Sequence, residues 1–378
     1  MSTALAATFR QAMPITERWA YFDHAAVAPL PRASAERMQR FAVECATEGD
    51  TLWPSWSAGA EECRKLSARL INADPAEIAL IPSTTMGISY IAEGWPWQPG
   101  DNVVLPADEF PSNQYPWLNL RSRGVEVRRV EMPATHLDLD RLNDACDART
   151  KIVSLSFVGY ASGWRTNIAD ALAIAHRHGA KLFVDAIQGL GAFPLDVAAV
   201  PVDFLAADSH KWLLGPEGAG FAYIRREHLD TLRPIAVGWN SVPGGYDYTT
   251  IKETWKPSAS RYEGGALNMP GYLAMGESLR LLLELGVANI GQCIVEYTTE
   301  LVTTLTKRGA NFHNRRDQPD HCSGIVTFSL PDQDPVLIRQ RCLDNGVVLS
   351  VRGGRLRIPA HGYNDASDLE KLCAALFS

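Results

Sequence analysis

Short apolar runs alternate with amphipathic stretches over the first 225 residues of the chain. Seven runs rich in Val, Ile, Leu and Phe have the length of buried strands. They cover 77–83, 101–107, 125–132, 151–158, 181–187, 203–209 and 219–225. Helical patterns lie between several of them, as in 167–180, where apolar residues recur at helical spacing before a glycine. This alternation predicts an α/β fold with a mainly parallel central sheet, covered by helices on both faces.

The pattern changes from about residue 269 onward. Two long helical stretches, 269–286 and 293–309, precede an alternation of strand (324–330), helix (334–346) and two further strands (347–354 and 355–360). We therefore expect a large α/β domain over 20–282, and a smaller α+β domain made of 283–378 together with residues 1–19. The Gly- and Pro-containing stretch 238–265 is too long for an ordinary connection, so it is predicted to be a functional loop.

Composition narrows the function to small-molecule chemistry. The 378 residues carry a net charge of -7, and the 36 Lys and Arg are scattered, which predicts neither a nucleic-acid surface nor a polybasic membrane surface. The seven cysteines form no CxxC pair, and an odd number argues against a disulfide framework or a structural zinc site. We expect no metal site, no membrane span and a cytoplasmic location with reduced thiols.

An acidic residue ends a very apolar strand in "KLFVDAIQGLG", 181–191. Asp185 stands at the carboxyl end of this strand, where open α/β sheets place their ligand sites, and Gln188 follows three residues later. A buried carboxylate needs a cationic partner. The protonated nitrogen of a pyridine ring would serve as that partner.

A lysine ends the next strand, in "AADSHKWLLGPEGAG", 206–220. Neighbouring parallel strands would bring His210 and Lys211 to the same rim as Asp185. A partly desolvated lysine loses its proton more easily and becomes a nucleophile for aldehydes. An acid for a ring nitrogen and an amine for an aldehyde together predict a pyridoxal phosphate site.

Such a site also needs a cradle for the phosphate. In "IPSTTMGIS", 81–89, a strand leads through Ser83, Thr84 and Thr85 into a predicted helix with Gly87 in its first turn. Hydroxyls and free amides at a helix N-terminus form an anion site. After another strand comes Phe110, an aromatic ring that could stack on the cofactor.

With these motifs, from "YFDHAAVAPLP" to "LRIPAHGYN", nearly the whole chain resembles the class V aminotransferase group of fold-type I pyridoxal phosphate enzymes. This group includes cysteine desulfurases, isopenicillin N epimerase-like proteins and kynureninase. The resemblance implies that Lys211 is the lysine of the internal aldimine, that Asp185 partners the pyridine nitrogen and that Gln188 partners the ring oxygen. It assigns phosphate contacts and ring stacking to Thr84, Thr85, His210 and Phe110.

The resemblance also implies a homodimer with its active site at the interface. "RYEGGALN" matches the segment that reaches the neighbouring subunit's phosphate, so Gly265 and Ala266 are expected to contribute backbone amides there. Arg357 matches the arginine that binds the carboxylate of an amino-acid substrate, a bidentate task suited to guanidinium. His24 and Trp53 are expected near the substrate.

Several of these residues could instead have a purely structural role. His24 could be a structural histidine, and Trp53 and Trp56 could be core residues. Phe110 could fill the core, and Arg357 could form a structural ion pair.

The chain departs from the desulfurase pattern at three places. Desulfurases carry a histidine over the ring, where this chain has Phe110, and a reactive cysteine between two arginine segments, where only "GGRL" separates Arg352 from Arg357. Asp208 stands where they have a phosphate-binding serine, which leaves the roles of Asp208 and Ser209 open.

The interpretation we favour is an aminotransferase that acts through an external aldimine and a Cα carbanion. A β-eliminating carbon–sulfur lyase is the next candidate and an amino-acid epimerase the third. From a different class, a dehydrogenase on a Rossmann-type sheet or a non-catalytic relative stays an alternative, although "GLGAF" at 189–193 is too short for a dinucleotide fingerprint.

Overall fold

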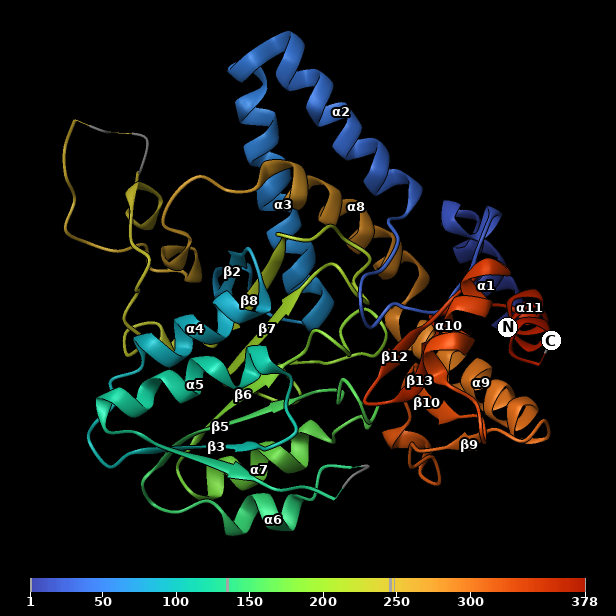
Figure 1. Ribbon diagram of the computed structural model, residues 1–378. Coiled ribbons are helices and arrows are strands. Elements are labelled where there is room, and N and C mark those ends of the chain that lie inside the picture. Colours follow the sequence, from blue (N-terminus) through green and yellow to red (C-terminus); the bar gives the residue numbers. More distant parts are fainter. Residues whose placement is uncertain (1, 134–135, 245–246, 248, 378) are drawn as a thin grey trace.

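The computed structural model describes residues 2–133, 136–244, 247 and 249–377. Figure 1 shows a large body built on a sheet and a smaller body that carries both termini. The large sheet has the strand order β2-β8-β7-β6-β5-β3-β4. Its strands are β2 (Ile78–Ile81), β3 (Asn102–Pro106), β4 (Glu126–Val130), β5 (Thr150–Ser156), β6 (Lys181–Asp185), β7 (Phe204–Asp208) and β8 (Gly220–Ile224). β8 is antiparallel to β2 and β7 and the other pairings are parallel, which confirms the predicted mainly parallel sheet.

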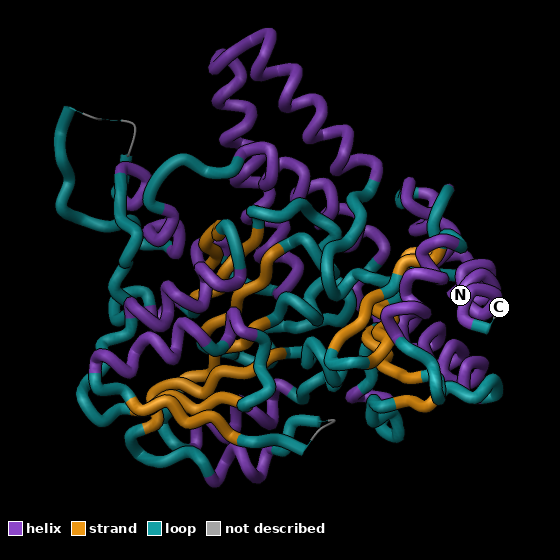
Figure 2. The backbone as a smooth tube through the Cα atoms, in the orientation of Figure 1, coloured by secondary structure: helices purple, strands orange, loops and turns teal. Residues whose placement is uncertain are grey.

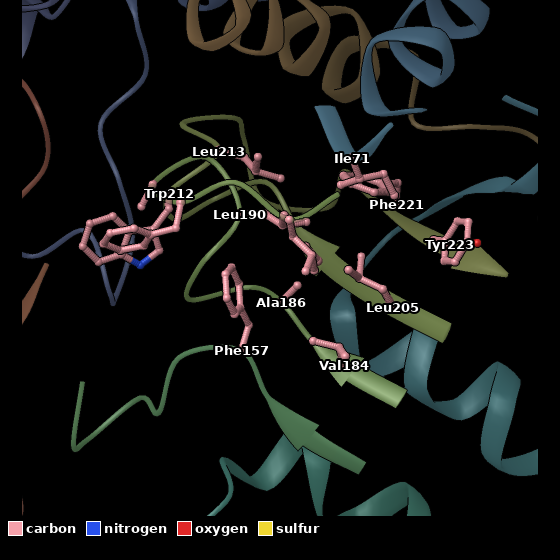
Figure 3. Close-up of a cluster of buried hydrophobic side chains, with 14 of the residues drawn as sticks. Ile71, Phe157, Val184, Ala186, Leu190, Leu205, Trp212, Leu213, Phe221 and Tyr223 are labelled. Atoms are coloured by element: carbon pink, nitrogen blue, oxygen red, sulfur yellow. The ribbon is translucent and has the colours of Figure 1, made fainter. Parts of the chain in front are cut away.

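Successive residues of each strand enter two different cores, because side chains alternate across a sheet. Val184 and Leu205 belong to the core on one face, part of which Figure 3 shows. Phe183 and Phe204 belong to the core on the other face. Buried side chains therefore pack on both faces of the sheet. Figure 2 shows helices lying over both of them.

Two sets of helices cover the two faces. The first face packs against α3 (Trp53–Ile71), α6 (Leu139–Asp144), α7 (Ile168–Arg177) and α8 (Met269–Leu285). The second face packs against α4 (Thr84–Gly94) and α5 (Tyr115–Asn119). Above the large body, α2 (Arg32–Glu48) and the start of α3 project outward as a helical arm (Figure 1).

A glycine sets how closely α4 approaches the sheet. A Cβ atom at Gly87 would lie 2.7 Å from the Cβ of Ala206 and 2.8 Å from the Cδ1 of Ile81. Both distances are below van der Waals contact, so a larger side chain would push the first turn of α4 away from β7. The glycine therefore fixes the position of the helix N-terminus at the rim of the sheet.

The smaller body contains a second, antiparallel sheet in the order β12-β13-β10-β9. Its strands are β9 (Asn311–Phe312), β10 (Ile325–Ser329), β12 (Ser350–Arg352) and β13 (Arg355–Pro359). Its helices are α1 (Ser2–Gln11), α9 (Val287–Thr306), α10 (Pro335–Asp344) and α11 (Ala366–Leu376). Arg10 of α1 forms a 2.8 Å ion pair with Asp368 of α11, so the N-terminal helix belongs to this body.

Two details concern the predicted domain limits. β1 (Ala20–Tyr21) pairs in parallel with β11 (Val347–Val348), so the start of the range predicted for the large domain is bound to the smaller body. The limit at 282/283 falls inside α8, which continues to Leu285. The chain passes from one body to the other through the α8–α9 junction.

Among the residues described, no single helix has the length and apolarity to cross a membrane. α8 and α9 reach that length and composition together, as a pair bent by 77°. The predicted loop 238–265 contains two short 3-10 turns, Trp239–Ser241 and Ala259–Glu263, and its residues 245–246 and 248 lie outside the described residues.

Candidate active site

A cavity of about 360 Å³ lies at the carboxyl ends of β6 and β7, at the side of the large sheet that faces the smaller body. The structure brings eight of the predicted residues to its wall: Thr84, Thr85, Phe110, Asp185, Gln188, His210, Lys211 and Arg357. A larger cavity of about 730 Å³ lies in the smaller body, lined by α1, α9 and the start of α11. None of the predicted residues lines that second cavity, so its size does not make it the better candidate.

Lys211 follows β7 and is only 7% exposed. Its Nζ lies 5.3 Å from the centroid of the Phe110 ring. Burial lowers the pKa of this amine to about 8; Asp185 opposes the shift and Arg357 adds to it. About one amine in four is then neutral at pH 7.5, against about one in a thousand for an ordinary lysine. Lys211 therefore has the reactivity of a nucleophile or a general base.

Asp185 ends β6, whose parallel pairing with β7 places Asp185 opposite Ala206. The carboxylate is 3% exposed and accepts a hydrogen bond of 3.1 Å from the N–H of Ile187. Burial raises its pKa to about 6, although Ile187 and the charge of Lys211 both lower it. A cation placed against Asp185 would therefore be bound strongly.

The first turn of α4 forms the opposite wall. Ser83 caps the helix by accepting a hydrogen bond of 3.2 Å from the N–H of Met86, and helix geometry gives the N–H groups of this turn no intrahelical acceptor. Thr84 Oγ1 accepts from the N–H of Asp208 at 2.9 Å, and Thr85 donates to Ser112 at 2.9 Å. These contacts fix both threonines beside an anion-binding helix end.

In the predicted cluster around His210, Ser209 is the residue that does not line the cavity. Ser209 is fully buried and its hydroxyl donates to the carbonyl of Pro216 at 2.8 Å. Asp208 accepts from the N–H of Ser209 at 2.7 Å, and its second oxygen lies 3.1 Å from Nδ1 of His210. The angle at that contact is not that of a hydrogen bond, so Nδ1 has no hydrogen-bond partner. Asp208 and His210 both line the cavity.

Gln188 is held from two sides. Its Nε2 donates to the carbonyl of Ala25 at 3.1 Å, and its Oε1 accepts from the indole of Trp212 at 2.8 Å. One N–H of the amide is left to donate to a ligand. The predicted contact of Gln188 with a ring oxygen stays a prediction.

Arg357, on β13, lies at the other end of the cavity with 1% of its surface exposed. Its Nε donates to Ser350 at 3.2 Å and its Nη1 to the carbonyl of Tyr160 at 3.0 Å, while Nη2 is buried without a hydrogen-bond partner. Burial lowers its pKa to about 10, which still leaves the guanidinium charged at neutral pH. A buried, charged donor with a free N–H group fits a carboxylate ligand.

A tight hairpin supplies this end of the cavity. Gly353 and Gly354 join β12 to β13 with φ values of 55° and 72°, the left-handed backbone that a two-residue turn requires. The turn has no room for a reactive loop between Arg352 and Arg357. Among the described residues that line the cavity, none is a cysteine.

Four predicted residues lie elsewhere. His24 is fully buried, with its ring nitrogens 2.9 Å from the carbonyl of Pro359 and 2.5 Å from the hydroxyl of Tyr363. Trp53 and Gly265 line a separate cavity of about 40 Å³, and Ala266 follows Gly265 in the chain.

Trp56, the other tryptophan of this segment, is a core residue. Its ring centroid lies 4.8 Å from that of Phe41, and its indole donates to Glu44 at 2.8 Å.

Sequence reasoning missed two polar residues beside the site. Tyr160 lines the cavity and stands edge-on to Phe110, with ring centroids 5.2 Å apart. Glu109 accepts hydrogen bonds from the N–H of Ser156, at 2.7 Å, and from its hydroxyl. Burial raises the pKa of Glu109 to about 7, and Asp185 contributes to this shift. An acid immediately before Phe110 at a strand end was the available signal for Glu109.

A second polar cluster lies at the opposite end of the sheet. Asp203 precedes β7, is fully buried, and accepts hydrogen bonds from His176 (2.9 Å), His228 (2.7 Å) and the N–H of Leu182 (2.8 Å). Asp203, Glu227 and His228 are close enough together to ligate a metal ion. The hydrogen bonds to Asp203 already account for its burial, so this cluster needs no ion.

The groups around the first cavity fit pyridoxal phosphate. The neutral fraction of the Lys211 amine suits its aldehyde, the buried Asp185 carboxylate suits its ring nitrogen, and the end of α4 with the unpartnered Nδ1 of His210 suits its phosphate. Phe110, 39% exposed, offers a ring face at the same cavity.

Comparisons with known proteins agree with this chemistry. The family model for aminotransferase class-V matches residues 20–372. A probable cysteine desulfurase of Methanothermobacter thermautotrophicus is 29% identical, covering 96% of this chain and 95% of the relative. A cysteine desulfurase of Klebsiella pneumoniae is 32% identical, covering 94% and 92%.

Solved structures share the fold. The apo cysteine desulfurase of Thermococcus onnurineus has a TM-score of 0.88 at 24% identity, covering 98% of this chain and 97% of that one. A C-DES mutant with glycine covalently linked to its PLP cofactor has a TM-score of 0.90 at 23% identity, covering 97% and 98%. The chain therefore belongs to the aminotransferase class-V family of pyridoxal phosphate-dependent enzymes, with the fold of type I.

Proposed function

We propose that this protein is a pyridoxal phosphate-dependent lyase that eliminates sulfur from the β-carbon of an amino acid such as cysteine or cystine. The observation that carries the proposal is the cavity itself. It joins a reactive amine, a buried acid and a buried guanidinium, and no cysteine is found among its described wall residues.

Each end of the cavity has its own task. Pyridoxal phosphate, when bound, withdraws electrons from the Cα of an attached amino acid and so makes the Cα proton acidic. The buried carboxylate of Asp185 would hold a proton on the ring nitrogen and so keep that withdrawal strong. The N-terminal turn of α4, Thr84, Thr85 and His210 hold the phosphate.

The substrate is oriented from the other end. Arg357 binds its α-carboxylate through the free Nη2 group, and Phe110 packs against the cofactor ring. With its lowered pKa, the buried amine of Lys211 would act as the general base that takes the Cα proton. A substrate with a leaving group on its β-carbon could then lose that group.

The leaving group is the point where this chain differs from a desulfurase that keeps sulfur on its own cysteine. The curated relatives named above are cysteine desulfurases, which favours a carbon–sulfur bond as the one that breaks. The turn at Gly353 and Gly354 offers no thiol to accept the sulfur. With cysteine and one water molecule as reactants, we therefore expect hydrogen sulfide, pyruvate and ammonia as products.

Transamination is the second candidate. It needs a single base that removes the Cα proton and returns it to the cofactor, and one lysine at the cavity can do both. The two reactions share every residue named above, and they differ in whether a leaving group is present on the substrate.

The complete site is proposed to require a second copy of the chain. Gly265 and Trp53 line a cavity separate from that of Lys211, together with Lys256. Ile251 and Trp255, in the long loop nearby, are 89% and 43% exposed. A dimer would cover these apolar side chains and could bring the segment around Gly265 to the partner's phosphate.

Product analysis tests the proposal. The purified protein, loaded with pyridoxal phosphate, is incubated separately with L-cysteine, L-cystine and L-alanine, and sulfide, pyruvate and ammonia are measured against time. Equal amounts of pyruvate and ammonia from the two sulfur substrates support elimination. Pyridoxamine phosphate with keto acid from all three would replace the lyase by the transaminase.

A further inference from the structure

Two buried atoms, one on Arg357 in the wall of the cavity and one on Asp23 behind it, have no hydrogen-bond partner although they are close to each other. They are Oδ1 of Asp23 and Nη2 of Arg357, 3.6 Å apart. Such orphaned polar atoms are rare in protein interiors and call for an explanation. The pair is close enough to attract but too far apart to consume the N–H groups of Nη2.

Asp23 is held rigidly in this position. The preceding residue, Phe22, donates its N–H to the carbonyl of Val348 at 2.8 Å, extending the pairing of β1 with β11. Arg357 stands directly opposite Ser350 in the β12–β13 hairpin and donates to its hydroxyl. Acid and guanidinium are therefore both fixed to the smaller body.

Asp23 also sets the charge of this end of the cavity. Two guanidinium groups, those of Arg352 and Arg357, line the cavity close to each other, since Arg352 lowers the pKa of Arg357. Burial raises the pKa of Asp23, and a hydrogen bond with Ser350 and the charges of both arginines oppose this rise. The single carboxylate offsets one of the two positive charges. One positive charge is left, which matches one substrate carboxylate.

A substrate with a second carboxylate would meet a different balance of positive and negative charge. Without Asp23, Arg352 would be available to pair with a side-chain carboxylate while Arg357 held the α-carboxylate. With Asp23 in place, that second carboxylate would compete with a fixed anion for the same guanidinium groups. Like charges brought together at a partly desolvated site repel each other and weaken binding.

We propose that Asp23 is a specificity-determining residue, which keeps Nη2 of Arg357 free for one carboxylate and selects amino acids with an uncharged side chain over those with an acidic one. This inference rests on the proposed function, because it concerns the amino acid bound by Arg357.

Equilibrium binding of two matched ligands tests it. 2-Methylasparagine and 2-methylaspartate have nearly the same shape, differ by one charge, and lack the Cα proton, so they bind without reacting further. Their dissociation constants are measured by absorbance titration of the protein loaded with pyridoxal phosphate. The wild type is expected to bind the amide at least about tenfold more tightly than the acid, the size of one unfavourable charge contact.

Three variants test whether the preference for the amide comes from Asp23. In Asp23→Asn the preference for the amide is expected to collapse to within about twofold. Asp230→Asn, which removes an almost fully exposed acid, makes the same change in net charge and should keep the wild-type ratio. Ser350→Ala removes a hydrogen-bond partner of both Arg357 and Asp23, so it should weaken both ligands and change their ratio less than Asp23→Asn does.

The outcomes separate the two claims. Equal affinity of the wild type for both ligands, or an unchanged ratio in a folded Asp23→Asn protein, would overturn the role of Asp23 alone. Failure of the wild type to bind either amino acid, with pyridoxal phosphate in place, would overturn the proposed function. Equal affinity of the wild type for the two ligands would overturn the role of Asp23 even if the Asp23 variant does not fold.

Discussion

The two ends of the cavity are built in different ways. At the cofactor end, Asp185 is the last residue of β6, and Lys211 comes three residues after the end of the adjacent strand β7. At the substrate end, Asp23, Tyr160 and Arg357 come from three distant segments of the chain. One end is thus fixed by strand pairing within the large body, and the other by contacts between the two bodies. We propose that the first end carries the cofactor chemistry and that the second end selects the substrate.

Loss of the amine should have the largest effect. Lys211→Ala removes both the covalent attachment of the cofactor and the general base, so turnover is expected to fall at least about 10³-fold. The visible absorbance of the bound cofactor should change with it. Lys151→Ala, at a lysine that pairs with Asp101 at 3.5 Å outside the cavity, is the matched control and should be silent. Normal turnover in Lys211→Ala would refute the assignment of the base.

Removal of the buried acid should come next. In Asp185→Asn the amide cannot hold a proton on the ring nitrogen, and the expected loss of turnover is about 10²-fold. Affinity for pyridoxal phosphate, measured by fluorescence titration, should weaken as well. Asp196→Asn removes an acid outside the cavity and should change neither quantity. An Asp185→Asn protein as active as the wild type would show that the ring nitrogen has another partner.

The substrate end should respond separately. Arg357→Lys keeps the charge but loses the planar donor, so KM for the amino acid is expected to rise about tenfold. Cofactor affinity should stay within twofold of the wild type, because Arg357 lies at the opposite end of the cavity. A parallel loss of cofactor affinity would contradict the division of the cavity into two ends.

The smallest expected effect is a pH dependence of cofactor capture by the apoprotein. Lys211 must be neutral to attack the aldehyde, and its pKa is lowered to about 8, so the rate should rise with pH and level off above 8. Asp185, with its pKa raised to about 6, must be ionised, so affinity should fall as the pH drops below 6. Stopped-flow absorbance measures the rate. A rate that keeps rising tenfold per pH unit to pH 10 would indicate an ordinary lysine.

The difference between the two ends of the cavity also explains which features the sequence could predict. Six of the seven strands of the large sheet were predictable because residues buried on both faces give continuous apolar runs, and a charge at the end of such a run marks the rim. The seventh, β4, is a partly exposed edge strand, so its prediction had a weaker basis. Asp185 and Lys211 followed from that local signal. Asp23 and Tyr160 did not, because their positions depend on how the smaller body meets the large one.

Resemblance to a family did not place every residue correctly in the structure of the single chain. Trp53 and Gly265 were expected at the active site, yet within this chain they line another cavity. His24 was expected near the substrate, yet it is buried between Pro359 and Tyr363. Motif matching gives a residue a place along the chain, whereas its surroundings come from tertiary contacts, or from a second copy.

The most direct test of the account locates the covalent bond to the cofactor. Protein loaded with pyridoxal phosphate is reduced with borohydride, digested with protease, and its peptides are analysed by mass spectrometry. Lys211 is predicted to carry the reduced cofactor, in a peptide that spans the end of β7. Modification of another lysine, or of none, would contradict the central claim that this cavity binds the cofactor through Lys211.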